Sequence, residues 1–297
     1  MPHPHILHMI TPLKHMSPFD VNMALDAGFN AVVPYTQVTL EEVRGLVQDA
    51  IFSRSPTDAA RTGLFIAGKS ASLALDMSKA AADAMVGPFR LSVFADPAGS
   101  FTTAAALVAV VERELAGRGR ALKDVAVAVF GATGVVGYSA GVIAALEGAR
   151  VTLVGYDGAA RVAAAAAEMK ARFGIEVAAA DGSTAEKKAA ALASVDVAFA
   201  AAAAGKQVLS TAELAAAGHL LVAADVNAVP PAGIEGLALD ARGVTIPGTR
   251  VAGIGPLAIG DVKYRTEAGL FRRMIETDEV LSLDFRDAFA LARKLAV

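Results

Sequence analysis

Between residues 122 and 226, apolar runs typical of buried strands alternate with segments typical of helices. Strands that are buried on both faces of a parallel sheet appear as continuous apolar runs rather than as alternating patterns. The alternation therefore predicts an α/β fold, with a doubly wound, Rossmann-type parallel sheet and helices on both of its faces. The predicted strands cover residues 125–130, 151–157, 175–181, 195–202 and 220–226, and the predicted helices cover 138–149, 159–174, 184–194 and 210–218.

The first 100 residues alternate in the same way and predict a second α/β unit with its own small parallel sheet. We therefore divide the chain into an N-terminal α/β domain, residues 1–110, and a Rossmann-type domain, residues 111–275. The segment 276–297 has helical character, and we expect it to pack back on one of the two. In the first domain the predicted strands cover residues 5–10, 31–35, 63–68 and 89–96, and the predicted helices cover 18–27, 40–51, 72–85 and 101–116.

The composition argues against several classes of protein. Hydrophobic residues make up 55% and charged residues 19% of the 297 residues, which argues against disorder. A membrane-spanning helix needs about 20 consecutive apolar residues, and no apolar run in this sequence is that long. No signal peptide is recognisable either, so we expect a cytoplasmic protein. The net charge of −3 without a basic block argues against nucleic-acid binding. The absence of cysteine excludes disulfides and thiolate metal sites.

Four of the five histidines, His3, His5, His8 and His15, lie within the first 15 residues. They could form a metal cluster, but we favour the start of an edge strand with solvated imidazoles, and we predict no metal site.

The sequence GATGVVG, residues 131–137, lies between a predicted strand and a predicted helix. In a dinucleotide-binding unit, such glycines allow a tight turn, the approach of the pyrophosphate and close packing of the helix on the strand. Gly131, Gly134 and Gly137 are spaced GxxGxxG rather than GxGxxG, which loosens the match. Their place between strand and helix still favours a cofactor pyrophosphate over a turn without a ligand.

The second predicted strand of this domain ends at Tyr156 and Asp157, with Arg161 shortly after. A carboxylate at this position accepts hydrogen bonds from the ribose of NAD, whereas the additional phosphate of NADP requires a basic residue. We therefore predict NAD as the preferred cofactor, with NADP tolerated through Arg161. Asp157 as the N-cap of the following helix is an equally good interpretation, and the two roles are compatible.

Four long motifs resemble those of the bacterial methylene-tetrahydromethanopterin dehydrogenases of methylotrophic C1 metabolism. They are ITPLKHMSPFDVNMALDAGF (10–29), GPFRLSVFADPAGSFTTAAA (87–106), ADVNAVPPAGI (224–234) and GIGPLAIGDVKYRTEAGLFRRM (253–274). The resemblance covers nearly the whole chain. It implies an N-terminal α/β substrate domain, a Rossmann-type NAD(P) domain and an active site in the cleft between them. It is closer to the branch that uses NAD, because the NADP-specific branch has Arg-Lys where Tyr156 and Asp157 stand.

The implied reaction is reversible hydride transfer from methylene-tetrahydromethanopterin to NAD(P), which yields the methenyl form. Because the pterin nitrogens stabilise the developing cation, the protein mainly supplies orientation, exclusion of water and electrostatics. For Lys263 and Asp20 we predict an orienting or electrostatic role in catalysis. It is an equally good interpretation that Lys263 is a structural lysine held in a salt bridge and that Asp20 only stabilises the start of a helix. The predicted substrate-binding residues are Lys14, His15, Phe19, Asp20, Lys69, Asp96, Ser100, Phe101, Thr102 and Thr103.

The predicted cofactor-binding residues lie in the glycine motif, at or just after the ends of the predicted Rossmann strands, and in the later motif GIGPLAIGDVKYR. They are Gly131, Thr133, Gly134, Val135, Val136, Gly155, Tyr156, Asp157, Arg161, Ala202, Ala203, Asn227, Ile254 and Lys263.

Two other functions stay open at this point. A methylene-tetrahydrofolate dehydrogenase is one, although the Tyr-x-x-x-Lys pair that we would expect in it is absent from the first 110 residues. A non-catalytic NAD-binding sensor is the other, but it would not need the polar residues at 14–20 and 96–103. The apolar composition further predicts a homo-oligomer.

Overall fold

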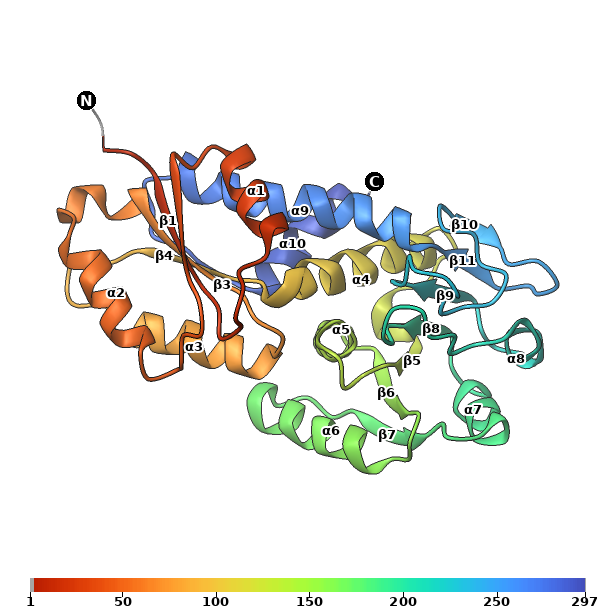
Figure 1. The fold of residues 1–297 in the computed structure, drawn as a ribbon. Coiled ribbons are helices and arrows are strands. Elements are labelled where there is room, and N and C mark those ends of the chain that lie inside the picture. The colour runs from red at the N-terminus through yellow and green to blue at the C-terminus, as the bar shows by residue number, and fades with distance from the viewer. Residues whose placement is uncertain (1–2, 297) are drawn as a thin grey trace. The chain divides into compact units, whose positions relative to one another are not determined.

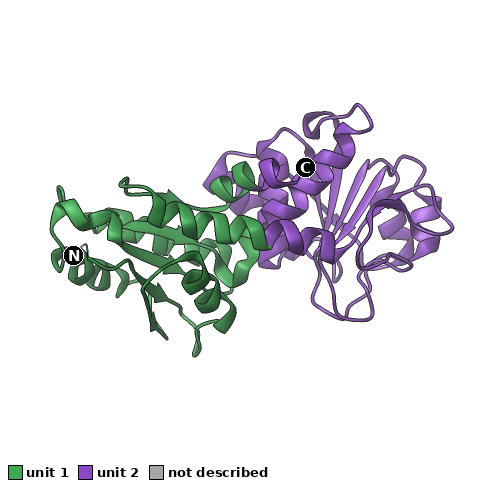
Figure 2. Ribbon diagram, turned by 90° about the horizontal axis from the view of Figure 1, so that it is seen from above, with its two compact units in different colours: residues 1–102, 264–291 green, residues 103–263, 292–297 purple. Residues whose placement is uncertain are grey.

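The computed structural model describes residues 3–296 and confirms the α/β fold class (Figure 1). The chain forms two compact units, which Figure 2 shows in different colours. Unit 1 comprises Met1–Thr102 and Tyr264–Leu291, and unit 2 comprises Thr103–Lys263 and Ala292–Val297. These bounds differ from the predicted limits at residues 110 and 275, because the chain passes from one unit to the other inside three helices. As limits of independently folding domains, the predicted ones stay a prediction.

Unit 1 contains a five-stranded parallel sheet with the order β12-β4-β3-β1-β2. The helices α1 and α9 lie on one of its faces, and α2 and α3 lie on the other (Figure 1). The strands are β1 (Ile6–Ile10), β2 (Ala31–Tyr35), β3 (Thr62–Ile66), β4 (Ser92–Ala95) and β12 (Ser282–Leu283). The helices that lie wholly in this unit are α1 (Pro18–Ala27), α2 (Val43–Phe52) and α3 (Ala71–Asp83), with short 3-10 turns at Pro56–Arg61 and Pro97–Gly99. The helices that belong partly to each unit are α4 (Ser100–Ala116), which lies mostly in unit 2, and α9 (Pro256–Glu276) and α10 (Phe285–Leu295), which lie mostly in unit 1.

Two sequence-based predictions for this unit were wrong. The strand β1 is not an edge strand, because it pairs with β2 on one side and β3 on the other. The segment 276–297 is not a single helical segment, because Ser282 and Leu283 form β12 beside β4 before α10 begins. A strand of this length is too short for its pattern to stand out in a sequence.

The helix α9 is fastened to the sheet of unit 1 by a cluster of phenylalanines. The ring of Phe271 lies 5.3 Å from that of Phe65, 5.2 Å from that of Phe94 and 6.2 Å from that of Phe29, measured between centroids. All four side chains are buried. Aromatic rings at such distances add about 0.5–1.5 kcal/mol per pair to the burial of their surface. The sequence reasoning did not identify this helix, although it supplies the centre of the core.

Unit 2 contains a seven-stranded sheet with the order β10-β11-β9-β8-β5-β6-β7, in which only the β10–β11 pair is antiparallel. This is the predicted Rossmann-type order with an additional edge hairpin. The strands are β5 (Ala126–Phe130), β6 (Arg150–Gly155), β7 (Ala178–Asp181), β8 (Val197–Ala200), β9 (Val222–Asp225), β10 (Arg242–Thr245) and β11 (Ala252–Ile254). The helices are α5 (Val135–Leu146), α6 (Ala160–Phe173), α7 (Ala185–Leu192) and α8 (Thr211–Ala216), with a 3-10 turn at Leu122–Asp124.

Two details of unit 2 correct the sequence analysis. The hairpin β10–β11 was missed, because β10 is short and largely exposed and lacks the apolar run of an inner strand. The helix α5 begins at Val135 rather than at residue 138, so the glycine motif supplies the first turn of the helix. Within residues 3–296, no helix has both the length and the apolar character that crossing a bilayer requires.

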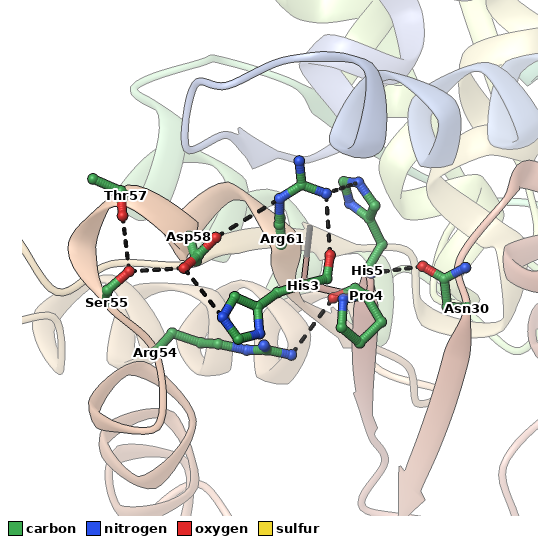
Figure 3. A network of polar contacts seen from close by, with 9 residues as sticks. All are labelled: His3, Pro4, His5, Asn30, Arg54, Ser55, Thr57, Asp58 and Arg61. Atoms are coloured by element: carbon green, nitrogen blue, oxygen red, sulfur yellow. Dashed lines mark hydrogen bonds and ion pairs between the residues drawn. The ribbon is translucent and has the colours of Figure 1, made fainter. Parts of the chain in front are cut away.

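Polar contacts fix the N-terminal segment to the turn before β3 (Figure 3). Nη1 of Arg61 donates to the carbonyl oxygen of His3 at 3.1 Å and lies 3.1 Å from Nε2 of His5. Nδ1 of His8 lies 3.1 Å from the hydroxyl of Tyr35. The prediction of solvated imidazoles was therefore wrong for His5 and His8, both of which are half-buried and have partners within the unit.

These two histidines should make the fold sensitive to acid. Burial, and then the charge of Arg61 for His5 and of Arg54 for His8, lowers the pKa of each imidazole below its ordinary value of 6.5. The unfolded chain therefore binds protons more readily, so this contribution to stability is complete above about pH 6.5 and is lost as the pH falls. We expect the free energy of unfolding in urea to fall between about pH 7.5 and pH 5.5, and a His5→Gln/His8→Gln variant to lose less over that range. Equal losses in both proteins would contradict this explanation.

Candidate functional site

The glycine turn lies where the order of the seven-stranded sheet reverses direction, between β5 and β8. Gly131 follows β5 with a φ of +78°, and a Cβ at this position would lie 2.4 Å from the carbonyl oxygen of Ala201, which follows β8. A Cβ at Gly137 would lie 2.4 Å from the carbonyl oxygen of Gly131. Only glycine fits at either position. In open α/β sheets, ligands bind at this reversal point, outside the carboxyl ends of the strands.

The amino terminus of α5 is directed at this turn. Gly134 is the N-cap of the helix, its N–H donates to the carbonyl oxygen of Gly131 at 3.0 Å, and its own carbonyl oxygen accepts from Tyr138 at 2.9 Å. The N–H groups of Val135, Val136 and Gly137 precede that first intrahelical bond and have no acceptor inside the helix. Such groups, together with the helix dipole, bind phosphate. The backbone here fits a pyrophosphate.

A cavity of about 650 Å³ opens beside the glycine turn, within unit 2. Pockets that bind small molecules usually have volumes of about 300–1,000 Å³, and the volume of this cavity lies within that range. Of the predicted cofactor-binding residues, Gly131, Tyr156, Ala202 and Ala203 line it. The other lining residues, which sequence reasoning missed as ligand contacts, are Phe130, Val154, Gly182, Ser183, Lys188, Lys206, Gln207 and Val208. The signal for most of them was present, because Gly182 and Ser183 follow β7 and residues 206–208 lie in the loop after β8.

A network of polar side chains joins the end of β6 to the glycine turn. Nη1 of Arg161 donates to Oδ2 of Asp157 at 3.2 Å and to the hydroxyl of Tyr156 at 3.3 Å, while Nη2 donates to Oγ1 of Thr133 at 3.4 Å. Asp157 raises the pKa of Arg161 through this hydrogen bond. Gly155 allows the turn, because a Cβ there would lie 2.0 Å from the carbonyl oxygen of Gly158. Asp157 is not the N-cap of α6, which is Ala159.

The loop after β9 is held by a buried carboxylate. Oδ1 of Asp225 accepts from the N–H of Asn227 at 2.9 Å, and Oδ2 accepts from that of Ile234 at 3.1 Å. Burial raises the pKa of Asp225 and these backbone donors oppose the shift. The amide of Asn227 donates to the carbonyl oxygen of Pro231 at 3.0 Å and accepts from Val229 at 2.9 Å, so much of its hydrogen bonding serves its own loop.

Two further predicted residues of this unit, Ile254 and Lys263, are not among the residues that line the cavity. Ile254 is buried at the end of β11, and Lys263 lies partly exposed on α9. Their contact with a cofactor, like that of Asn227, stays a prediction.

In unit 1, several predicted substrate-binding residues follow the carboxyl ends of neighbouring strands. Lys14 and His15 follow β1, Lys69 follows β3, and all three are exposed. The two loops are neighbours, because a Cβ at Gly68 would lie 3.4 Å from the ring of Pro12. These side chains therefore share one edge of the sheet. At the start of α1 on this edge, Phe19 is 47% exposed, whereas Asp20 is 2% exposed, with its N–H bonded to Oγ of Ser17.

The segment after β4 uses its polar groups to start the helix α4. Oδ1 of Asp96 accepts from the N–H groups of Phe101 and Thr102 at 2.8 and 3.3 Å, and Oδ2 accepts from Oγ1 of Thr102 at 2.6 Å. Asp96, Ser100 and Thr102 are buried, Thr103 is half-buried, and the Phe101 ring packs edge-on against Phe285. The structure thus makes Asp96 the acceptor for the first N–H groups of α4, whereas Thr102 lies inside the helix and donates its hydroxyl to Asp96 instead of capping it. A direct contact of this group with substrate stays a prediction.

Two non-glycine residues with positive φ lie at the same edge, and sequence reasoning did not identify them as candidates. They are Gln37, with φ of 59°, after β2, and Ala98, with φ of 55°, after β4. Left-handed backbone at such residues costs about 1–3 kcal/mol and is concentrated at functional sites. The N–H of Gln37 is held by the carbonyl oxygen of Leu13 at 2.9 Å. No sequence pattern marks a strained conformation of this kind.

Within residues 3–296, no cluster of histidine, aspartate and glutamate side chains is arranged to hold a metal ion.

Comparison with known proteins places these sites in context. Residues 18–98 match the family model described as methylene-tetrahydromethanopterin dehydrogenase, N-terminal. The chain is 56% identical over 292 residues to the NAD(P)-dependent methylenetetrahydromethanopterin dehydrogenase of Methylorubrum extorquens, covering 98% of both chains. It is 31% identical over 280 residues to the bifunctional protein MdtA of the same organism, covering 94% of this chain and 95% of that one.

Among solved structures, a shikimate 5-dehydrogenase from Listeria monocytogenes, in complex with shikimate and NAD, superposes with a TM-score of 0.53. The identity is 13% and 93% of each chain is covered, so this likeness shows the fold alone.

Two glycine substitutions inside helices should affect stability in opposite directions. Gly137→Ala places a methyl group against the backbone of Gly131 and should lower the free energy of unfolding by about 1–3 kcal/mol. Gly45→Ala in α2 meets no atom within 4 Å and should raise it by about 0.5–1 kcal/mol, because alanine is the better helix former. Urea unfolding of both variants tests this, and a Gly137→Ala protein as stable as the wild type would show that the turn has room for a side chain.

Proposed function

Because the chain belongs to the methylene-tetrahydromethanopterin dehydrogenase family, we propose that it oxidises methylene-tetrahydromethanopterin reversibly to the methenyl form, with NAD(P) as the hydride acceptor. The observation that carries the proposal is the 56% identity over 98% of both chains. The glycine turn and the cavity at the reversal point of the seven-stranded sheet support it, since they fit a dinucleotide.

In this proposal, the first turn of α5 binds the pyrophosphate. The N–H groups of Val135 and Val136 contribute donors, and the lack of a side chain at Gly131 and Gly134 lets the phosphates approach. The cavity beside Tyr156 and Ala202 receives the adenosine, whose ribose lies near Asp157. We propose further that Asn227, Ile254 and Lys263 serve the nicotinamide half.

The pterin is proposed to bind at the carboxyl edge of the five-stranded sheet. Phe19 offers an exposed ring on which a planar heterocycle can stack, and Lys14, His15 and Lys69 offer polar contacts for its periphery. The buried Asp96 and Thr102 then act as positioning residues, because they fix the start of α4 and the loop before it.

The proposed hydride transfer needs no side chain as an acid, base or nucleophile. The nicotinamide ring, when bound, supplies the hydride acceptor, and the nitrogens of the pterin stabilise the positive charge that develops. The protein's contribution is therefore to orient the two reactants and to exclude water. Lys263 and Asp20 are proposed to adjust the electrostatic field rather than to transfer protons. We further propose that the enzyme works in the cytoplasm as a homo-oligomer.

A spectrophotometric assay tests the proposed reaction. The protein is mixed with methylene-tetrahydromethanopterin or methylene-tetrahydrofolate, each with NAD and with NADP, and formation of the reduced nucleotide is followed. We expect reduction with the methanopterin and both nucleotides, and greater activity with NAD. Nucleotide reduction with the folate alone would assign the enzyme to a different substrate class, and no reduction with either pterin would refute the proposal.

The stacking role of Phe19 can be tested against a neighbour on the same helix. Phe19→Ala should raise the KM for the pterin about 3- to 10-fold at unchanged KM for NAD, because a stacked ring contributes about 0.5–1.5 kcal/mol. Leu25→Ala, at a position with 45% exposure against 47% for Phe19, is the matched control. It should change either constant by less than about twofold. Equal effects of both substitutions would assign Phe19 a merely structural role.

A further inference from the structure

The ion pair of Asp157 and Arg161 is exposed at the position where the adenosine ribose is expected. The side chain of Arg161 is 55% exposed and that of Asp157 is 39% exposed, with 3.2 Å between Nη1 and Oδ2. Ion pairs at such exposure contribute little to stability, because water screens the two charges. The pair can therefore open at little cost when a ligand offers either partner a better contact.

Two neutral groups hold the guanidinium independently of Asp157. The hydroxyl of Tyr156 and Oγ1 of Thr133 accept from Arg161 at 3.3 and 3.4 Å, and the guanidinium carbon lies 5.9 Å from the centre of the Tyr156 ring. Thr133 belongs to the glycine turn and Tyr156 follows β6. Arg161 therefore keeps its place between these elements if the carboxylate turns away.

The two charges suit two different ligands. An ionised carboxylate only accepts hydrogen bonds, so Asp157 can bind the hydroxyls of an unmodified ribose but repels a phosphate. A guanidinium presents several donors in a fixed fork that matches phosphate oxygens.

We propose that Asp157 and Arg161 form an exchangeable pair that lets one site accept both NAD and NADP. With NAD, Asp157 accepts from the ribose hydroxyls while Arg161 neutralises its charge. With NADP, the 2′-phosphate replaces Asp157 as the partner of Arg161. This inference rests on the proposed function, since it assumes that the site in unit 2 binds these nucleotides.

Nucleotide binding in the absence of pterin tests the exchange. Arg161→Gln should weaken NADP binding about 10- to 100-fold, as expected for the loss of a charge-assisted contact, and should change NAD binding less than about threefold. Lys170→Gln is the matched control, because it removes an exposed cation paired with Glu176 from the last turn of the same helix. It should leave both affinities unchanged in calorimetric titrations.

A second variant and a pair of fragments complete the test. Asp157→Asn should weaken NAD and leave NADP unchanged or tighter. Adenosine 2′,5′-bisphosphate should bind the wild type more tightly than adenosine 5′-monophosphate does, and this difference should vanish in Arg161→Gln.

Three outcomes would overturn the exchange: equal weakening of NAD and NADP in Arg161→Gln, equal weakening of both in Asp157→Asn, or a wild type that binds only one of them. Intact binding of both nucleotides without oxidation of the pterin would refute the proposed function and leave the exchange standing.

Discussion

The close approach of two backbone segments at Gly131 is the constraint on which the proposed nucleotide site depends. A side chain at Gly131 would collide with Ala201, and one at Gly137 would collide with Gly131 itself. With glycine at both positions, the first turn of α5 can pack directly on the turn that leaves β5. The free N–H groups of that helix are thereby brought to the point where β5 and β8 part, which is the one place on such a sheet where a ligand can enter between the strand ends.

Both sheets carry candidate ligand residues at their carboxyl edge, although their cores are built differently. In unit 2, apolar strands are covered by the helices of the Rossmann repeat. In unit 1, the phenylalanine cluster around Phe271 fixes a helix that comes from far along the chain onto strands from its beginning. A rigid sheet leaves the loops after its strands as the parts that are free to specialise. The strained backbones of Gln37 and Ala98 occur in such loops, where the surrounding hydrogen bonds can hold them.

The sequence predicted the elements whose patterns are local and long. Continuous apolar runs located β5, β6, β8 and β9, and the glycine motif located the turn between β5 and α5. It failed for β12, which has only two residues, and for β10, whose residues are largely exposed and form no apolar run. The lining residues after β7 and β8 were missed, although their place at the carboxyl ends of predicted strands was a usable signal, because their residue types alone do not mark a ligand site. The motif after β4 was predicted to bind substrate, and a polar cluster in a sequence does not reveal that its groups bond to one another.

The acidic side chains at the strand ends illustrate how burial determines what a carboxylate can do. Asp96 and Asp225 are both nearly inaccessible, and each receives backbone N–H groups from the loop that follows its strand. Removing such a partner would leave a buried polar group unsatisfied, so these loops are held firmly in one conformation. Asp157 lies at an equivalent strand end but is exposed, and its partner is a side chain rather than the backbone. Water can replace that partner at little cost. An aspartate therefore fixes the loop at Asp96 and at Asp225, whereas Asp157 is available to exchange its partner for a ligand.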